Sequence, residues 1–252
     1  MDDKLTRQLL YGLFLLFVIF MFKRAEAEQP LNVAVAANFA PAMELIRDEF
    51  SAETGVPVQL TISSSGRLFT QIKNRAPFDL YFSADSERPE ILYNEEFCME
   101  PDLYATGKVV LWSMSEKLCS VKEWKDVLLS PEVKKIAIAN PDTAPYGAVA
   151  KQACRQLDDW PYIEQKFVYG TNVGQAFQYA QIGAVQVSFV ALSLALSEKG
   201  KPGCFWEIPE SISVGQKACV IAYGPNTVTA GRFLQHVTSS QTASVRKKFG
   251  YQ

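Results

Sequence analysis

The sequence lacks most of the patterns on which enzyme active sites and nucleic-acid-binding surfaces depend. Its single histidine, His236, stands near the C-terminus on a predicted helix, so the serine run at 63–65 has no obvious histidine to act as a general base. Neither the phosphate-loop pattern G-x-x-x-x-G-K-[ST] nor the dinucleotide pattern G-x-G-x-x-G occurs. The formal net charge of −2 includes no basic stripe. These absences argue against a histidine-dependent hydrolase, a nucleotide-dependent enzyme and a protein that binds nucleic acid.

Two aspartates, Asp79 and Asp85, are the nearest approach to a catalytic carboxylate pair, and they flank the end of one predicted strand. Paired carboxylates serve as general acid and base in many enzymes. Aspartate is also a common helix cap, and we expect these two residues to cap a helix and anchor the fold. The sequence therefore predicts no catalytic residues.

Cysteine is scarce and follows no metal-binding spacing. The five cysteines, none of them in a C-x-x-C pair or a Cys/His cluster, are Cys98, Cys119, Cys154, Cys204 and Cys219. An oxidising compartment would allow up to two disulfides among them. They could equally be small buried apolar side chains. The spacing does not choose between these alternatives, and it does not identify a pairing.

The sequence has one long apolar run, and it lies at the N-terminus. Lys4 and Arg7 precede the run at residues 9–22, and an A-x-A pattern follows at 25–27. Fourteen residues are short for a membrane span, which needs about 20. We predict that residues 1–27 are a signal peptide and that the protein is exported to the periplasm. The basic pair at 23–24 leaves an uncleaved membrane anchor as the alternative.

What the sequence does contain is a strand-to-helix junction repeated four times. In each, a short apolar run ends in small or turn-forming residues and continues as a predicted helix, at 33–45, 59–72, 136–153 and 167–180. A helix start has unpaired backbone N–H groups and the positive end of the helix dipole. Such a start is a ready binding site for an anion. Four of them facing one cleft would bind a small oxyanion through neutral donors.

The order of these segments predicts an α/β fold of two lobes. The predicted strands lie at 31–37, 56–62, 78–84, 108–113, 134–140, 167–171, 184–192 and 218–225. Helices between them imply parallel sheets with right-handed crossovers. No linker separates the halves, so we predict lobe I from residues 28–111 and 222–252 and lobe II from 112–221. Ligands bind beyond the carboxyl ends of strands in such sheets.

Each junction offers one candidate donor, and each also has a simpler explanation. Asn38 would donate its side-chain amide or merely cap a helix, and Ser64 lies in a hydroxyl run that is also typical of a solvated turn. Tyr146 and Val173 would donate backbone N–H groups from the first turn of a helix, although the Tyr146 ring could simply be core. The combination points to a binding site more strongly than any one junction does.

Several segments, in the same order, resemble the periplasmic molybdate-binding proteins of ABC-type import systems. The resemblance runs from Leu31 to Gln252 through VAVAANFAPAM, SSSGRLFTQI, APFDLYFSAD, ATGKVVLWS, NPDTAPYGAVAKQA, VGQAFQYAQIGAVQVSFVAL and KKFGYQ. It implies a two-lobed class II periplasmic-binding-protein fold, in which each lobe is a mostly parallel sheet flanked by helices. The ligand would lie in the cleft between the lobes.

The resemblance also implies roles for particular residues. The oxyanion would be held by the Asn38 side chain, helped by the Ala37 backbone, and by the Ser64 hydroxyl. The Tyr146 and Val173 backbones would complete the site. One branch of the family adds a tyrosine hydroxyl at the place of Ala191, so that contact is expected to be missing here. No protein group would bind the metal directly, and no cofactor is implied.

The function implied is capture of molybdate, with tungstate as a second ligand, and delivery to an ABC permease and its ATPase. The protein would act as a periplasmic monomer and not as an enzyme. Two alternatives stay open: a binding protein for another tetrahedral oxyanion, such as sulfate or thiosulfate, and a membrane-tethered oxyanion sensor.

Overall fold

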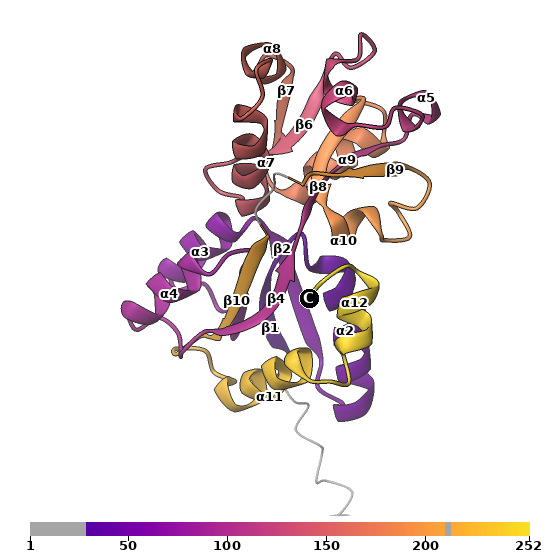
Figure 1. Ribbon diagram of the computed structural model, residues 1–252. Coiled ribbons are helices and arrows are strands. Elements are labelled where there is room, and N and C mark those ends of the chain that lie inside the picture. The colour runs from indigo at the N-terminus through magenta and orange to yellow at the C-terminus, as the bar shows by residue number, and fades with distance from the viewer. Residues whose placement is uncertain (1–28, 210–212) are drawn as a thin grey trace, which may run out of the picture.

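Two α/β lobes make up the computed structural model, which describes residues 29–209 and 213–252 (Figure 1). The predicted signal peptide or anchor at 1–27 lies outside these residues. Within the described part of the chain, no helix has the length and apolar character that a membrane span requires.

Lobe I contains a five-stranded sheet of order β2-β1-β3-β10-β4. Its strands are β1 (Leu31–Ala36), β2 (Val58–Ser63), β3 (Leu80–Phe82), β4 (Asp102–Gly107) and β10 (Val214–Val220). β10 pairs antiparallel with both of its neighbours, whereas β1 pairs parallel with β2 and β3. Four strands therefore run in one direction and β10 runs against them.

Lobe II repeats this arrangement with the order β7-β6-β8-β5-β9. Its strands are β5 (Val109–Ser113), β6 (Ile136–Ala139), β7 (Phe167–Gly170), β8 (Val187–Ala191) and β9 (Cys204–Glu207). Here β5 is the strand that runs against the others. The mostly parallel sheets predicted from the sequence are confirmed in both lobes.

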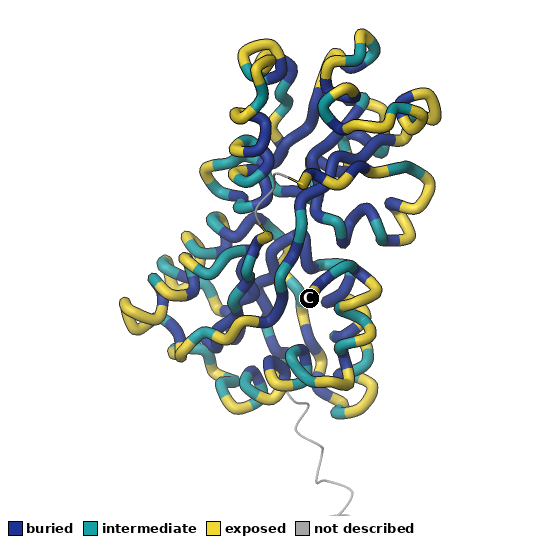
Figure 2. The backbone as a smooth tube through the Cα atoms, in the orientation of Figure 1, coloured by how far each residue is buried: buried dark blue, intermediate teal, exposed yellow. Residues whose placement is uncertain are grey.

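Helices cover both faces of each sheet, and the apolar residues lie between the layers. Lobe I carries α2 (Ala40–Thr54), α3 (Ser65–Lys73), α4 (Glu87–Asn94), α11 (Thr227–Thr238) and α12 (Ala243–Lys248). Lobe II carries α5 (Glu116–Cys119), α6 (Trp124–Leu129), α7 (Pro145–Arg155), α8 (Trp160–Glu164), α9 (Val173–Gln181) and α10 (Leu192–Ala195). Figure 2 shows the buried strands at the centre of each lobe and the exposed residues on the outer loops. Burial of these apolar layers drives the fold.

The chain passes between the lobes twice. The strand pairing places both lobe boundaries at other residues than the sequence predicts. The first crossing is Lys108, between β4 and β5, and the second lies between the end of β9 and the start of β10. The predicted division at 111/112 would cut through β5, and the division at 221/222 would assign β10 to lobe II. β10 instead pairs with β3 and β4 in lobe I. Extended chain runs almost unbroken from β4 into β5, so no local signal marks the first crossing.

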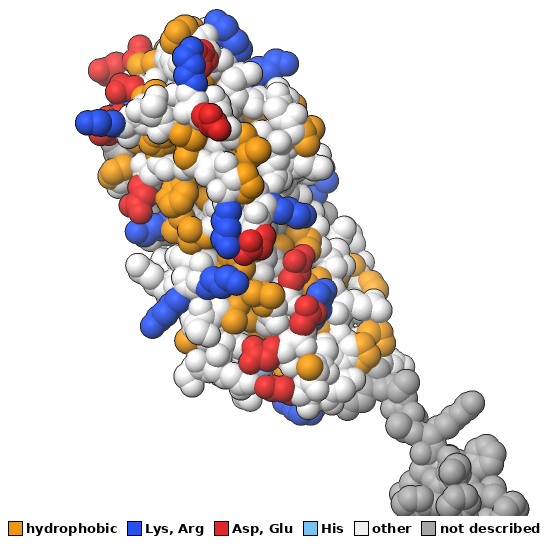
Figure 3. All heavy atoms as spheres, turned by 90° about the vertical axis from the view of Figure 1, so that its right-hand side faces the viewer, with side chains coloured by type: hydrophobic (Ala, Val, Ile, Leu, Met, Phe, Trp, Pro, Cys, Tyr) orange, Lys and Arg blue, Asp and Glu red, His pale blue; other side chains and the backbone are white. Residues whose placement is uncertain are grey.

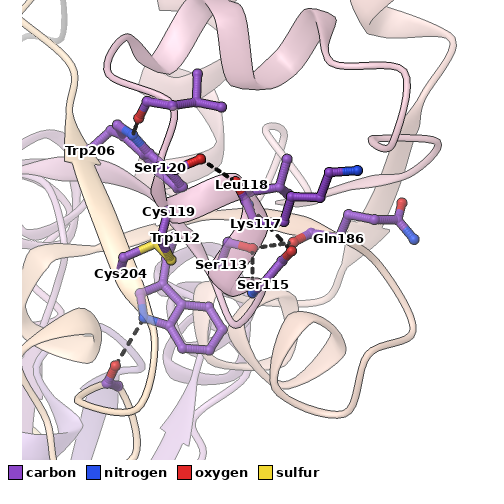
Figure 4. Close-up of a disulfide and its surroundings, with 12 residues drawn as sticks. Trp112, Ser113, Ser115, Lys117, Leu118, Cys119, Ser120, Gln186, Cys204 and Trp206 are labelled. Atoms are coloured by element: carbon purple, nitrogen blue, oxygen red, sulfur yellow. Dashed lines mark hydrogen bonds between the residues drawn. A yellow bond between two sulfur atoms is a disulfide. The ribbon is translucent and has the colours of Figure 1, made fainter.

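A disulfide closes one corner of lobe II. Cys119, at the end of α5, is bonded to Cys204, at the start of β9, across 85 residues of sequence (Figure 4). Nearby, Trp206 Nε1 donates to Val121 O at 2.8 Å. The other three cysteines are buried thiols. The sequence left open whether the cysteines form disulfides or are small buried side chains. Cys119 and Cys204 do the first, and the remaining three do the second.

We expect loss of this disulfide to destabilise the protein. Replacing both Cys119→Ser and Cys204→Ser should lower the free energy of unfolding by about 2–4 kcal/mol, because the unfolded chain loses a long covalent loop. Urea denaturation of the exported protein measures the change. Reductant should shift the unmodified protein by a similar amount and leave the double variant where it was. Equal midpoints for the two proteins without reductant would contradict the expectation.

Candidate functional site

All four predicted junctions are present, and they meet between the lobes. β1 leads to α2, β2 to α3, β6 to α7 and β7 to α9. Each junction lies at the carboxyl end of a parallel strand, where the sheet and its helices leave a crevice. The lobes touch there, since Gly66 N–H at the start of α3 donates to Thr143 O of lobe II at 2.9 Å. A Cβ on Gly66 would lie only 2.9 Å from the same oxygen, so a glycine allows this close approach.

A small pocket lies at this meeting point. All five residues singled out from the sequence line it: Ala37, Asn38, Ser64, Tyr146 and Val173. The remaining lining residues are Ala36, Ser63, Ser65, Ala84, Ala144, Pro145 and Asn172. The structure thus brings together residues that are up to 137 positions apart in the sequence, seven of them from lobe I and five from lobe II.

Lobe I contributes the N-terminus of α3. Ser64 is its N-cap, and its hydroxyl oxygen accepts from Arg67 N–H at 3.4 Å. Neither the Ser64 hydroxyl hydrogen nor the backbone N–H groups of Ser64 and Ser65 donate to another residue of the described chain. Ser65 uses its own hydroxyl oxygen to accept from Ala84 N–H at 2.8 Å, which fixes the wall beside it. The Ser64 hydroxyl hydrogen is therefore free to face a ligand, and the hydroxyl of Ser63, which also lines the pocket, is not bonded to another described residue.

Lobe II contributes the N-termini of α7 and α9. Tyr146 follows Pro145 in the first turn of α7, and Val173 is the first residue of α9. Asn172 caps α9, its side chain accepting from Gln175 N–H at 3.0 Å. Within the described ranges, the N–H groups of Tyr146 and Val173 have no acceptor. Both helix starts therefore present backbone donors and the positive end of a dipole to the pocket.

Asn38 takes a position that the sequence did not predict. Phe39, not Asn38, is the N-cap of α2, and no side chain caps this helix. Asn38 Nδ2 donates to Gln216 Oε1 at 2.6 Å and to Tyr251 OH at 3.1 Å. The amide is thus anchored in a buried polar cluster at the wall of the pocket. Gln216 and Tyr251 carry no local signal of this role, because they approach Asn38 only through the tertiary fold.

The pocket contains donors but no charged side chain. Of its lining residues only Tyr146 is ionisable, and burial raises the pKa of its phenol well above the ordinary value of 10.0. Tyr146 is 2% exposed and stays protonated at neutral pH. An anion here would be held by neutral N–H and O–H groups, each of which is worth more against a charged partner than against a neutral one.

A wider groove adjoins the pocket and shares Ala37 and Asn172 with it. Its rim includes acidic and basic side chains in balance, among them Glu44, Glu198 and Lys248. Figure 3 shows charges of both signs interspersed over the side of the molecule that carries α2, α10 and α12. The features of this region that would favour an anion are therefore the inner donors of the pocket and not a charged surface.

The two aspartates have the structural roles expected of them. Asp79 accepts from the backbone N–H groups of Asn32, at 2.8 Å, and Asn226, at 3.1 Å, which holds the start of α11 against the sheet. Asp85 accepts from Arg88 N–H at 3.1 Å and pairs with the Arg88 guanidinium. Neither residue lines the pocket.

Other potential catalytic or metal-binding groups lie away from the pocket. His236 packs its ring against Phe50 in lobe I. Ala191, at the end of β8, is not a lining residue. Within residues 29–209 and 213–252, no three histidine, cysteine or carboxylate side chains gather as a metal site would require.

Comparisons with known proteins agree with this arrangement. Residues 31–252 match the family described as bacterial extracellular solute-binding protein. The chain is 32% identical over 222 residues to the molybdate-binding protein ModA of Rhodobacter capsulatus, with 86% of each chain covered. It is 34% identical over 226 residues to ModA of Azotobacter vinelandii, covering 88% of this chain and 89% of that one.

Solved structures show the same fold. The periplasmic molybdate-binding protein of Azotobacter vinelandii superposes with a TM-score of 0.82 at 32% identity, covering 88% of this chain and 98% of that one. The sulfate-binding protein SubI of Mycobacterium tuberculosis superposes with a TM-score of 0.74 at 15% identity, covering 89% and 86%. The second likeness is one of fold alone. The family match over residues 31–252 and the relatives above 30% identity place this chain in the bacterial extracellular solute-binding protein family.

Proposed function

We propose that this protein captures molybdate outside the cytoplasm and delivers it to an ABC-type permease and its ATPase. The observation that carries the proposal is the pocket itself. Four helix starts from two lobes converge on it, and it is lined by neutral donors in a chain more than 30% identical to two molybdate-binding proteins. Tungstate, which has nearly the same size and charge, would bind as a second ligand. The protein would bind and release its ligand without chemical change, so it is not an enzyme.

The ligand would bridge the lobes. On the lobe I side, the Ser64 hydroxyl and the Asn38 backbone N–H would meet its oxygens, while the Asn38 amide shapes the wall behind them. The Ala37 N–H donates to Ser63 O at 2.9 Å, so Ala37 would line the pocket without donating to the ligand. On the lobe II side, the N–H groups of Tyr146 and Val173 would donate to it. Each hydrogen bond to a charged group contributes about 1.5–3 kcal/mol. Neither lobe holds the full set of donors, so tight binding would require closure.

Selectivity would follow from the lack of an ionised acceptor in the pocket. Molybdate is fully deprotonated near neutral pH, so a site that only donates suits all four of its oxygens. Protonated phosphate carries a hydroxyl that would find no carboxylate to accept its hydrogen. Sulfate has the same charge but is smaller, so its hydrogen bonds would be stretched and weakened. Pocket size would therefore separate molybdate from sulfate.

Export is supported by chemistry as well as by family. The Cys119–Cys204 disulfide is of the kind that persists in oxidising compartments such as the periplasm. Cleavage after residue 27 would release a monomeric periplasmic form, and retention of the apolar run would tether the protein to the membrane. The mass of the exported protein separates these two forms.

A thermal-shift panel tests the proposed ligand. At a hundredfold excess over Kd, a ligand stabilises the folded protein by about 2.7 kcal/mol. In a chain of this size that raises Tm by about 5–10 °C. We expect this shift with molybdate and with tungstate, and little change with phosphate. A shift with sulfate and none with molybdate would instead support the sulfate alternative.

A proline substitution tests the Val173 backbone donor without altering a polar side chain. Val173→Pro removes the N–H and exchanges one buried apolar side chain for another, and the backbone tolerates it because proline suits the first residue of a helix and Asn172 before it is already extended. Loss of one hydrogen bond to a dianion should weaken molybdate binding by about 10- to 150-fold in calorimetry.

Glu116→Pro is the matched control for this substitution. Glu116 is the exposed first residue of α5, it follows an extended Ser115, and it lies outside the pocket. The Glu116→Pro variant should bind molybdate with the same affinity as the unmodified protein. Equal affinities for both proline variants would show that Val173 does not bind the ligand through its N–H.

The affinity for molybdate should be constant between about pH 7 and 9, because no lining residue titrates there. The pKa of Tyr146 is raised in the folded state, so its protonated form and the stability that it supports persist up to the unfolded-state value of 10.0. Stability is lost only as the pH rises beyond that value towards the folded-state pKa. Calorimetry between about pH 7 and 9 measures the affinity for molybdate at each pH. An affinity that changes tenfold within it would show that an ionising group contacts the ligand.

A further inference from the structure

A buried cluster of polar side chains joins the two lobes behind the oxyanion pocket. We call it the interlobe polar cluster and define it as Asn38, Gln216 and Tyr251 from lobe I with Tyr146 and Ser193 from lobe II. All five residues are buried. The proposed function uses only the backbone N–H of Tyr146, and it gives the Tyr146 side chain no role.

The Tyr146 hydroxyl is the central contact between the lobes in this cluster. It accepts from Gln216 Nε2 at 3.2 Å and from Asn38 Nδ2 at 3.5 Å. Both partners belong to lobe I, whereas Tyr146 lies in the first turn of α7 in lobe II. The same residue therefore directs its backbone towards the pocket and its side chain into the other lobe.

Asn38 is held from both lobes as well. Its carbonyl oxygen accepts from Ser193 Oγ of lobe II at 2.6 Å and from Tyr251 OH of lobe I at 2.8 Å. Its amide reaches Gln216 Oε1 at 2.6 Å. Opening the lobes would separate Asn38 from Ser193 and from Tyr146 while leaving its lobe I partners in place.

The cluster lies directly against the first crossing between the lobes. Gly107 ends β4, one residue before the crossing. A Cβ on Gly107 would overlap the Tyr146 hydroxyl and would lie 2.7 Å from Gln216 Nε2. The crossing thus has room for the Tyr146 hydroxyl only because residue 107 has no side chain.

We propose that Tyr146 is a positioning residue whose hydroxyl fastens lobe II onto lobe I in the closed form and slows release of the ligand. The proposal rests on the proposed function, because it concerns regulation of the same site. Opening about the two crossings would draw the hydroxyl out of the cluster and remove the acceptor of Gln216 Nε2, whereas Asn38 Nδ2 would keep its lobe I acceptors. Unpaired buried donors are costly, so the cluster favours the closed form even before the ligand adds its own hydrogen bonds.

Tyr146→Phe tests this role, because it deletes the hydroxyl and keeps the ring and the backbone N–H. Loss of a neutral hydrogen bond should speed molybdate release about 3- to 10-fold in stopped-flow displacement, with the association rate changed less than twofold. A general loss of folding would not produce this split between the two rates.

Tyr104→Phe is the matched control. The Tyr104 hydroxyl is also buried and lies 3.0 Å from Gln216 Oε1 and 2.9 Å from Ser83 O, but all three residues belong to lobe I. Loss of the Tyr104 hydroxyl should lower Tm about as much as Tyr146→Phe does. It should leave the molybdate release rate within twofold of the rate of the unmodified protein. If Tyr104→Phe speeds release as much as Tyr146→Phe does, the effect is one of general stability and the proposal is wrong.

Spin labels make the test independent of the ligand. Gln71→Cys and Gln152→Cys place labels on exposed positions of α3 and α7, on opposite sides of the cleft. Without ligand, Tyr146→Phe should shift the distance distribution between the labels towards longer, open distances. If the unmodified protein binds no molybdate but this shift occurs, the proposed function fails and the fastening role stands. Unchanged distances together with an unchanged release rate would overturn the fastening role itself.

Gly107→Ala gives a second, independent variant. Its methyl group would displace the Tyr146 hydroxyl, so it should open the protein and speed release in the same way as Tyr146→Phe. Because both changes remove one interaction, the double variant should release molybdate no faster than the faster single variant. Fully multiplicative effects would show that Gly107 and the Tyr146 hydroxyl act separately and would contradict the proposal.

Discussion

A helix cannot pair the backbone N–H groups of its own first turn, and in this protein the helices that follow four strands begin around one small pocket. The N–H groups at Ser64, Tyr146 and Val173 have no acceptor within the described chain, so an oxyanion would satisfy donors that the fold leaves unpaired. The pocket therefore needs no lysine or arginine. Because two of the helix starts belong to each lobe, the proposed binding of a ligand to all four would make binding and lobe closure a single event.

Close contact between the lobes depends on residues with small side chains or none. Gly66 meets the Thr143 backbone at hydrogen-bond distance, and Gly107 leaves space for the Tyr146 hydroxyl beside the first crossing. A side chain at either position would keep the lobes apart. The geometry of closure is therefore determined as much by these two glycines as by the polar groups that line the pocket.

The four junctions could be predicted from the sequence because their signals are local. An apolar run, a turn and a helix start lie within about fifteen residues of each other, and proline at 145 or serine at 64 marks the first turn. The lobe boundaries could not be predicted in this way. Whether β10 belongs to lobe I depends on its pairing with β3 and β4, and such pairings join residues far apart in the sequence. The same limit hid the partners of Asn38, which lie 178 and 213 residues away, and the choice of Cys119 and Cys204 among five cysteines.

Two sets of hydrogen bonds would join the lobes: those from the pocket donors to the bound oxyanion, and those within the interlobe polar cluster. The two sets differ in strength, and this difference gives them different roles. Bonds to a dianion contribute about 1.5–3 kcal/mol each, whereas neutral bonds such as those of the Tyr146 hydroxyl contribute about 0.5–1.5 kcal/mol. If the neutral set were the stronger, the lobes would stay closed without ligand and exclude it. With the ligand's bonds stronger, the proposed ligand molybdate would decide whether the protein closes, and the interlobe polar cluster would adjust how long it stays closed. A transport protein needs this order, because it must release to a permease what it has captured.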